Sequence, residues 1–292
     1  MCIFAIISDI VNKTWLIVNK RLNIMNRKLG FIGCGKMASA IIGGVISSKF
    51  LGVNDIQASE TSEDKAKQKT LELGINVITD NKELVKTSEV VFIATTPNFA
   101  ETVLNEIKDY VTPDKLIVSI CAGVTTGFIQ SILGEKTKVV RVMPNTPALV
   151  LEGMSGVCKG KSAGVNDVKF VVDLLSNIGK AIEVTEKQMD IVTAISGSGP
   201  AFYYKVINEI ARAGEKLGLD YEKSLTLSIQ TAIGSAKMLL ASDKSAEDLI
   251  SSVATKGGCT RVGVDYMDEV DTSDIFYNLI DKTAKKANAL GR

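Results

Sequence analysis

Short apolar runs rich in β-branched residues alternate with helix-like stretches over most of this chain, and no other feature restricts its fold as much. The run 90–94 is apolar throughout, which is typical of a strand covered by helices on both faces. Strands that alternate with helices predict βαβ units, so we expect an α/β fold with a doubly wound, mostly parallel sheet. The predicted strands are 28–33, 56–58, 75–78, 89–95, 116–121, 139–143, 154–157 and 181–184, and the predicted helices between them are 36–48, 62–73, 99–110, 125–133 and 166–177.

The composition changes after residue 185. All five prolines lie at or before Pro200, and apolar residues then recur at helical spacing through 201–213 and 225–240. This pattern predicts an all-helical C-terminal domain over 186–292. The segment 232–236 is rich in small residues and suits either packing within the chain or the seam of a homodimer, of which we expect the dimer.

Residues 1–24 carry two short apolar clusters, and neither is long enough to span a bilayer. Asp9 interrupts the first cluster and no basic leader precedes it, unlike a secretory signal. We interpret these residues as an appendage, either a real extension or a non-native start, because Met25 lies directly before the first predicted strand.

The chain contains no histidine. This excludes Ser-His and Cys-His nucleophile pairs and histidine-ligated metals, and we predict no metal site. Five scattered cysteines without a Cys-x-x-Cys pair favour a reducing, cytoplasmic location. The balance of 34 Lys+Arg against 33 Asp+Glu leaves a net charge of +1, so neither nucleic acid nor a membrane is a predicted partner.

The first predicted strand runs into a glycine-rich turn and then an amphipathic helix. This is the context of the dinucleotide fingerprint G-x-G-x-x-G/A, and it predicts that residues 25–185 form a Rossmann-type dinucleotide-binding domain. Gly33 permits the tight turn, Gly35 lets backbone N–H groups approach a pyrophosphate, and Ala38 allows close packing of helix on strand. The motif residues predicted to bind the cofactor are Gly33, Gly35, Lys36, Met37 and Ala38.

The second strand ends at Ser59 and Glu60. An acidic side chain here binds a ribose 2′-hydroxyl, whereas hydroxyl or basic side chains accept a 2′-phosphate. Glu60 favours NADH, but Ser59 and its neighbours can donate to a phosphate, so both NADPH and NADH remain open as cofactors.

Three later strands end in loops at the same predicted edge of the sheet, where ligands bind in open α/β sheets. Pro144 and Pro147 stiffen the last of these loops, which suits either a wall of a nicotinamide pocket or a simple turn. The cofactor-binding candidates in the three loops are Ala94, Thr95, Thr96, Pro97, Ala122, Gly123 and Asn145.

Two glycine-rich segments of the helical domain, 196–200 and 255–260, resemble anion-binding turns. In the second, Gly257 and Gly258 turn backbone N–H groups towards a carboxylate, and the hydroxyls of Thr255 and Thr260 add directional donors. Because these two segments follow a dinucleotide domain in the chain, together they predict a small carboxylate substrate. Each segment alone also fits a helix cap.

Taken together, these motifs resemble the pyrroline-5-carboxylate reductase family, whose reaction is the last step of proline biosynthesis. The resemblance covers nearly all of the chain from Met25. It rests on the segments 29–38, 121–124, 143–147, 195–201 and 257–260, which occur in the family's order.

The resemblance implies NAD(P)H-dependent reduction of the cyclic imine 1-pyrroline-5-carboxylate to L-proline. It further implies a homodimer, and often a ring of dimers. By this similarity Thr260 is the catalytic residue and binds the substrate ring nitrogen. The substrate carboxylate is held by Thr255, Gly257, Gly258 and Cys259 together with the Thr260 backbone.

The chain departs from the family pattern at several positions. Thr96 stands where the family usually has lysine, Lys36 replaces a common Asn or Gln, and Lys256 replaces a proline.

Two alternative functions stay open on sequence alone. A β-hydroxyacid-dehydrogenase-like enzyme would use Lys205 and Asn208, and a non-catalytic nucleotide-sensing relative would keep only the fold.

Overall fold

The computed structural model describes residues 27–291, so the interpretation of residues 1–24 lies outside them. The chain divides into two compact units. Among the described residues, we call 27–197 together with 285–291 the sheet unit, and Ser198–Ala284 the helical unit. No helix in the described range is both long and apolar enough to cross a membrane.

The sheet unit contains eight strands, and their ranges agree with the predicted ones to within a few residues. The strands are β1 (Leu29–Ile32), β2 (Ile56–Ser59), β3 (Asn76–Ile78), β4 (Val90–Ile93), β5 (Leu116–Ser119), β6 (Lys138–Met143), β7 (Gly153–Lys159) and β8 (Gly179–Glu183). The helices of this unit are α2 (Lys36–Ser47), α3 (Glu63–Leu73), α4 (Asn81–Thr87), α5 (Pro97–Ile107), α6 (Thr126–Leu133), α7 (Val165–Leu175) and α8 (Met189–Val192).

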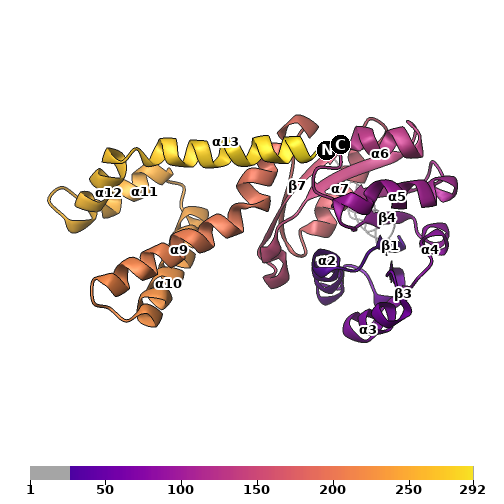
Figure 1. The fold of residues 1–292 in the computed structure, drawn as a ribbon, viewed down its shortest axis with the longest axis horizontal. Helices are drawn as coiled ribbons and strands as arrows, with labels where there is room; N and C mark the ends of the chain where they lie inside the picture. The colour runs from indigo at the N-terminus through magenta and orange to yellow at the C-terminus, as the bar shows by residue number, and fades with distance from the viewer. Residues whose placement is uncertain (1–26, 292) are drawn as a thin grey trace, which may run out of the picture. The chain divides into compact units, whose positions relative to one another are not determined.

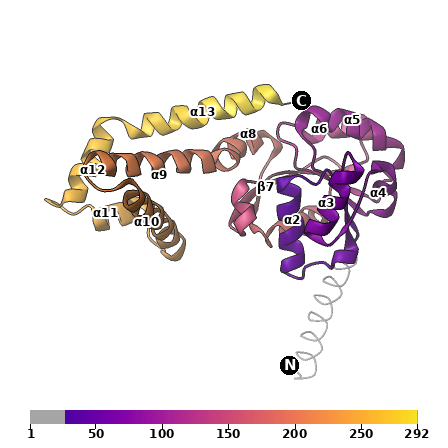
Figure 2. The same ribbon diagram turned by 60° about the horizontal axis from the view of Figure 1, so that its bottom comes forward.

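The strands form one sheet in the order β3-β2-β1-β4-β5-β6-β7-β8. Within the described residues every neighbouring pair of strands is parallel except β6 with β7, so the predicted doubly wound and mostly parallel sheet is confirmed. In the views of Figures 1 and 2, α2 and α3 lie on one side of the sheet and α4, α5 and α6 on the other.

Each central strand is buried on both faces, which explains its continuous apolar sequence. Phe31 and Phe92 point into the core beneath α2 and α7, whereas Ile32 and Ile93 point into the core beneath α4 and α5. The Phe31 and Phe92 rings stack with centroids 4.4 Å apart, so neighbouring strands contact through their side chains as well as their backbones.

Helix α4 has no counterpart among the predicted helices. It begins after Asp80, whose carboxylate accepts the N–H groups of Lys82 and Glu83. An Asp followed three residues later by Glu is a start signal for a helix, and this signal was available in the sequence.

The helical unit confirms the predicted all-helical C-terminal part. Its helices are α9 (Gly199–Lys216), α10 (Tyr221–Ala241), α11 (Ala246–Val253) and α12 (Cys259–Glu269), and α13 (Thr272–Leu290) runs from this unit into the sheet unit. Helices α9 and α10 pack side by side (Figure 2). A methyl group at Gly214 of α9 would lie 2.5 Å from Ser224 Oγ of α10, so the glycine permits this close approach.

The stacked ring of Phe92 provides a test of the core. Replacing it with alanine should lower the free energy of unfolding by about 3–5 kcal/mol, because the side chain is fully buried. Phe99→Ala is the matched control, since Phe99 is 63% exposed. Urea unfolding at one fixed protein concentration measures both variants, and equal losses would contradict the assignment of Phe92 to the core.

Candidate active site

The loops after β1, β4, β5 and β6 all lie at one edge of the sheet. These four strands run parallel to one another, so their carboxyl ends point the same way. Strand order reverses between β1 and β4, and ligands of open α/β sheets bind in the crevice at such a point. The tertiary structure thus brings the predicted cofactor residues, spread from Gly33 to Asn145 in the sequence, to one edge of the sheet unit.

Gly33 fits its turn for two physical reasons. Its φ is +90°, which disfavours any residue with a side chain, and its N–H donates to the Ser59 carbonyl 3.1 Å away. A Cβ here would lie 2.9 Å from the Ala94 carbonyl oxygen. The glycine therefore lets the β1 loop pass against the end of β4.

Gly35 is different, because the fold itself does not need it. Its φ of −71° suits any residue, and a Cβ would meet no atom within 4 Å. Gly35 is the N-cap of α2, where backbone N–H groups lack helical partners and favour an anion. Lys36 follows as the first, exposed residue of the helix, next to the half-buried Met37, and the buried Ala38 packs against the sheet. No atom of the described chain fills the space beside Gly35, so this helix N-terminus is open to an anionic group.

Glu60 reaches from the end of β2 to this loop. Its carboxylate accepts the N–H of Cys34 at 3.0 Å and the N–H of Thr61 at 3.2 Å. This places an acidic group beside the fingerprint loop, as the recognition of a ribose hydroxyl requires.

Two other predicted cofactor residues have their polar groups paired inside the fold. Ser59 is buried, and its hydroxyl donates to Asn81 Oδ1 at 2.6 Å. Asn145 Nδ2 donates to the Ser196 carbonyl at 3.2 Å, and its Oδ1 accepts the Met154 N–H at 2.8 Å. Their side chains brace the loops that carry them.

The loops after β4 and β5 are linked by a buried cysteine. The Cys121 thiol donates to the carbonyl oxygens of Ile93 and Thr95, at 3.4 and 3.2 Å. Burial raises the pKa of this thiol, which keeps it protonated as a donor. Thr96 is the N-cap of α5 and Pro97 its first residue, a position that suits proline because no helical N–H partner is lost there.

Ala122 and Gly123 follow in the β5 loop. Ala122 is exposed, whereas Gly123 is buried with a φ of +76°. A Cβ on Gly123 would lie 3.0 Å from the Leu290 carbonyl oxygen at the end of α13. This loop is therefore in contact with the C-terminal end of the described chain.

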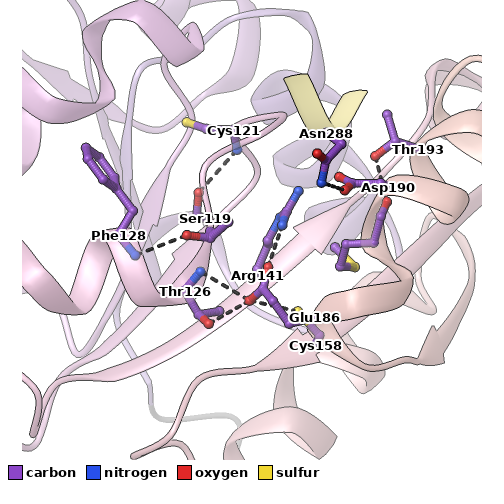
Figure 3. A network of polar contacts seen from close by, with 12 residues as sticks. Ser119, Cys121, Thr126, Phe128, Arg141, Cys158, Glu186, Asp190, Thr193 and Asn288 are labelled. Atoms are coloured by element: carbon purple, nitrogen blue, oxygen red, sulfur yellow. Dashed lines mark hydrogen bonds and ion pairs between the residues drawn. The ribbon is translucent and has the colours of Figure 1, made fainter. Parts of the chain in front are cut away.

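Figure 3 shows a polar network beside this loop that no motif in the sequence predicts. The buried guanidinium of Arg141 on β6 pairs with Glu186, whose other carboxylate oxygen accepts both the N–H and the hydroxyl of Thr126 at the start of α6. Burial acts to raise the pKa of Glu186, but the bonds from Thr126 and Arg141 outweigh it and hold the pKa below its ordinary value. Burial and the Glu186 charge raise the pKa of Cys158 to about 12.

In the helical unit, the segment 255–260 forms an exposed turn into α12. Gly257 has a φ of +79°, and the Gly258 N–H donates to the Thr255 carbonyl at 3.0 Å. A Cβ on Gly258 would lie 3.1 Å from Thr255 Oγ1, so the glycine lets this hydroxyl lie beside the helix N-terminus. Cys259 and Thr260 are the first, exposed residues of α12, where backbone N–H groups lack helical partners and therefore favour an anion.

The interpretation of 196–200 as a second anion-binding turn is wrong. Thr193–Gly197 form a π-helical turn that leads directly into α9, and neither Gly197 nor Gly199 has a positive φ. An anion-binding nest needs a left-handed residue, which helical backbone does not supply. Pro200 lies in the first turn of α9, where proline is tolerated because no helical N–H partner is lost.

Lys205 and Asn208, the residues of the dehydrogenase alternative, both have partners in the helical unit. Lys205 pairs with Glu209 one turn along α9, and Asn208 accepts the Tyr221 hydroxyl at 2.9 Å.

Comparison with known proteins agrees with this geometry. A family model described as pyrroline-5-carboxylate reductase dimerisation matches residues 186–290, and one described as NADP oxidoreductase, coenzyme F420-dependent, matches residues 28–123. A pyrroline-5-carboxylate reductase of Methanosarcina acetivorans is 38% identical, with 91% of this chain and 99% of the relative covered. The chain belongs to the pyrroline-5-carboxylate reductase family. Pyrroline-5-carboxylate reductase 2 of Bacillus subtilis is 34% identical over 89% of this chain and 94% of the relative.

Solved structures of the family share the fold. A Plasmodium falciparum pyrroline carboxylate reductase with NADP bound has a TM-score of 0.81 and 34% identity, over 92% of this chain and 100% of that one. A Coxiella burnetii pyrroline-5-carboxylate reductase has a TM-score of 0.87 and 29% identity, over 91% and 99%. The predicted family and the oxidoreductase class are thereby confirmed, and the dehydrogenase and sensor alternatives receive no support.

The open space beside Gly35 yields a prediction. Gly35→Ala should leave the fold unchanged but weaken NADH binding by about tenfold, the equivalent of roughly 1.4 kcal/mol, because the methyl group enters the space left for the diphosphate. Gly43→Ala is the matched control, since Gly43 lies on the same helix and is equally uncrowded. Fluorescence titration with NADH measures both variants, and unchanged binding by Gly35→Ala would remove this residue from the cofactor site.

Proposed function

We propose that this chain reduces 1-pyrroline-5-carboxylate to L-proline with NADPH or NADH as the hydride donor. The observation that carries the proposal is the presence, in one chain, of a dinucleotide-type loop between β1 and α2 and an anion-type helix N-terminus at α12. Family membership supports the same reaction.

The residues at the sheet edge fit a nicotinamide dinucleotide. The N-terminus of α2 with Gly33 and Gly35 would hold the diphosphate, and Lys36 would add a positive charge where Thr96 lacks the family's usual lysine. Glu60 would accept hydroxyl groups of the adenosine ribose. The bound cofactor supplies the hydride, and the chain's residues bind and orient the reactants.

The turn 255–260 is suited to a carboxylate. Unpaired N–H groups at the start of α12 and the Thr255 hydroxyl would bind its two oxygens, and the exposed Lys256 would add attraction. This leaves the Thr260 hydroxyl to hydrogen-bond the ring nitrogen.

The imine carbon accepts hydride most readily when the ring nitrogen is protonated, so the nitrogen needs a neighbouring polar group. The Thr260 hydroxyl, directly or through water, would hold the N–H in place during transfer. Catalysis then relies on positioning and electrostatics rather than on a strong base, and a chain without histidine is sufficient.

The helical unit supports a homo-oligomer, with a homodimer as its basic assembly. In residues 198–284, all of which the structure describes, the buried apolar side chains are Ala211 and Ala254. Large apolar residues such as Ile210, Leu240 and Val262 are exposed, and an apolar surface of this extent is typical of an obligate interface. Through these helices, dimers would assemble further into a ring.

We place the enzyme in the cytoplasm. Cys34, Cys121 and Cys158 are buried as free thiols and Cys259 is an exposed one, which suits a reducing compartment.

Turnover is the direct test of the proposal. The purified full chain, mixed with 1-pyrroline-5-carboxylate and either NADH or NADPH, should lose nicotinamide absorbance and form one proline per cofactor oxidised. If a folded, nucleotide-binding chain oxidises neither cofactor, the proposal is wrong.

The role of Thr260 gives a second test. Thr260→Ala should lower kcat/KM for the imine by roughly 100-fold while NADH still binds, because a proton-positioning group is lost. Thr260→Ser should restore most of the activity. Thr226→Ala is the control, since that exposed hydroxyl bonds only within its own helix. Unchanged turnover by Thr260→Ala would exclude the hydroxyl from the mechanism.

Glu60 provides a test of cofactor choice. Glu60→Ala should raise the ratio of NADPH to NADH kcat/KM by about tenfold, because a carboxylate repels a 2′-phosphate by roughly 1.4 kcal/mol. Glu63→Ala serves as the control, since its carboxylate binds Thr79 instead. A constant ratio in steady-state kinetics would mean that Glu60 does not contact the ribose.

A further inference from the structure

Two long-range contacts within the sheet unit hold the loop between β5 and α6 in place, and the proposed mechanism uses neither of them. One joins Thr126 to Glu186, which is itself paired with Arg141, and the other joins Gly123 to the end of α13. Between them lies a cavity of about 440 Å³ whose wall includes Gly123, Arg141 and Asn288.

The first contact holds the end of the loop. Glu186 accepts the Thr126 N–H at 3.2 Å and its hydroxyl at 2.6 Å, and so binds the first residue of α6 from outside the helix. Arg141, only 3% exposed, neutralises this carboxylate. A buried cation keeps its partner in place, because separating the pair would leave an uncompensated charge in the interior.

The second contact holds the middle of the loop. The Leu290 carbonyl lies where a side chain on Gly123 would have to be. Asn288 Nδ2 donates to Asp190 Oδ2 at 2.8 Å, which ties this end of α13 to α8 (Figure 3). Glu186 and Asp190 lie four residues apart in the sequence, so both contacts start from the same short segment.

The held loop belongs to the nicotinamide half of the site. Glu60, which is proposed to bind the adenosine ribose, follows β2, so in this scheme the half built on β1, β2 and β3 takes the adenosine. The opposite half, which contains β4 and β5, then takes the nicotinamide. Ala122 and Gly123 lie in this second half.

We propose that two contacts, Arg141 with Glu186 and Asn288 with Asp190, hold the loop at Ala122 and Gly123 in the position that binds the nicotinamide end of the cofactor. The residues of these contacts are positioning residues. They touch neither cofactor nor substrate in this scheme, which rests on the proposed function. A loop held at both its middle and its end presents its backbone in one arrangement, and small displacements at a hydride-transfer site have large effects on rate.

The test compares two ligands that share the adenosine half. Glu186→Gln and Asn288→Ala should each weaken NADH binding, by about tenfold for the first, while the affinity for ADP-ribose, which lacks nicotinamide, stays unchanged. Isothermal titration of the full chain with each ligand measures both affinities. Asn288→Ala keeps the test decisive should Glu186→Gln fail to fold, because Asn288 is exposed.

Two matched controls accompany these variants. Glu183→Gln removes an exposed carboxylate at the end of β8, and Asn278→Ala removes an amide that bonds only to Asp274 on α13. Neither should separate the two affinities.

The proposal is overturned if both ligands lose affinity equally, or if neither does in the folded variants. A wild-type chain that binds NADH without reducing the imine would contradict the proposed function alone, and the difference between NADH and ADP-ribose affinities would still decide this proposal.

Discussion

The parallel pairing of β1 with β4 at the centre of the sheet is the constraint on which the site depends. It brings the Gly33 turn against the Ala94 carbonyl. It also places the point at which the strand order reverses between β1 and β4. Each further parallel strand then adds one more loop at the same edge. A side chain at Gly33 would separate these loops and open the crevice in which a dinucleotide would bind.

The two units bury apolar surface in different ways. The sheet unit encloses two complete cores, one on each face of the sheet, with Phe31 and Phe92 in one and Ile32 and Ile93 in the other. The helical unit buries almost none of its large side chains, and its stability therefore depends on contacts beyond its own helices. In the proposed function the same division separates the two binding roles, because the sheet unit carries the loops proposed for the cofactor and the helical unit carries the turn 255–260 proposed for the substrate.

Much of the fold was predictable because its signals are local. Continuous apolar strands such as 90–93 and the spacing of Gly33, Gly35 and Ala38 depend only on neighbours in the chain. Helix α4 was missed although Asp80 and Glu83 formed its start signal. The turn at 196–200 was misread because a run of glycine and serine fits both an open nest and a helix, and only the packed backbone distinguishes the two.

The sequence by itself determined the strands, the fingerprint loop, the helical C-terminal part and the family, because each follows from periodicity or from a short motif. Only the tertiary structure decided that the side chains of Ser59 and Asn145 form hydrogen bonds inside the fold. It also decided that Glu186 pairs with Arg141, 45 residues away in the sequence. The physical reason is that such contacts join groups from separate elements. Nothing near either residue in the sequence reports the partner that folding brings to it.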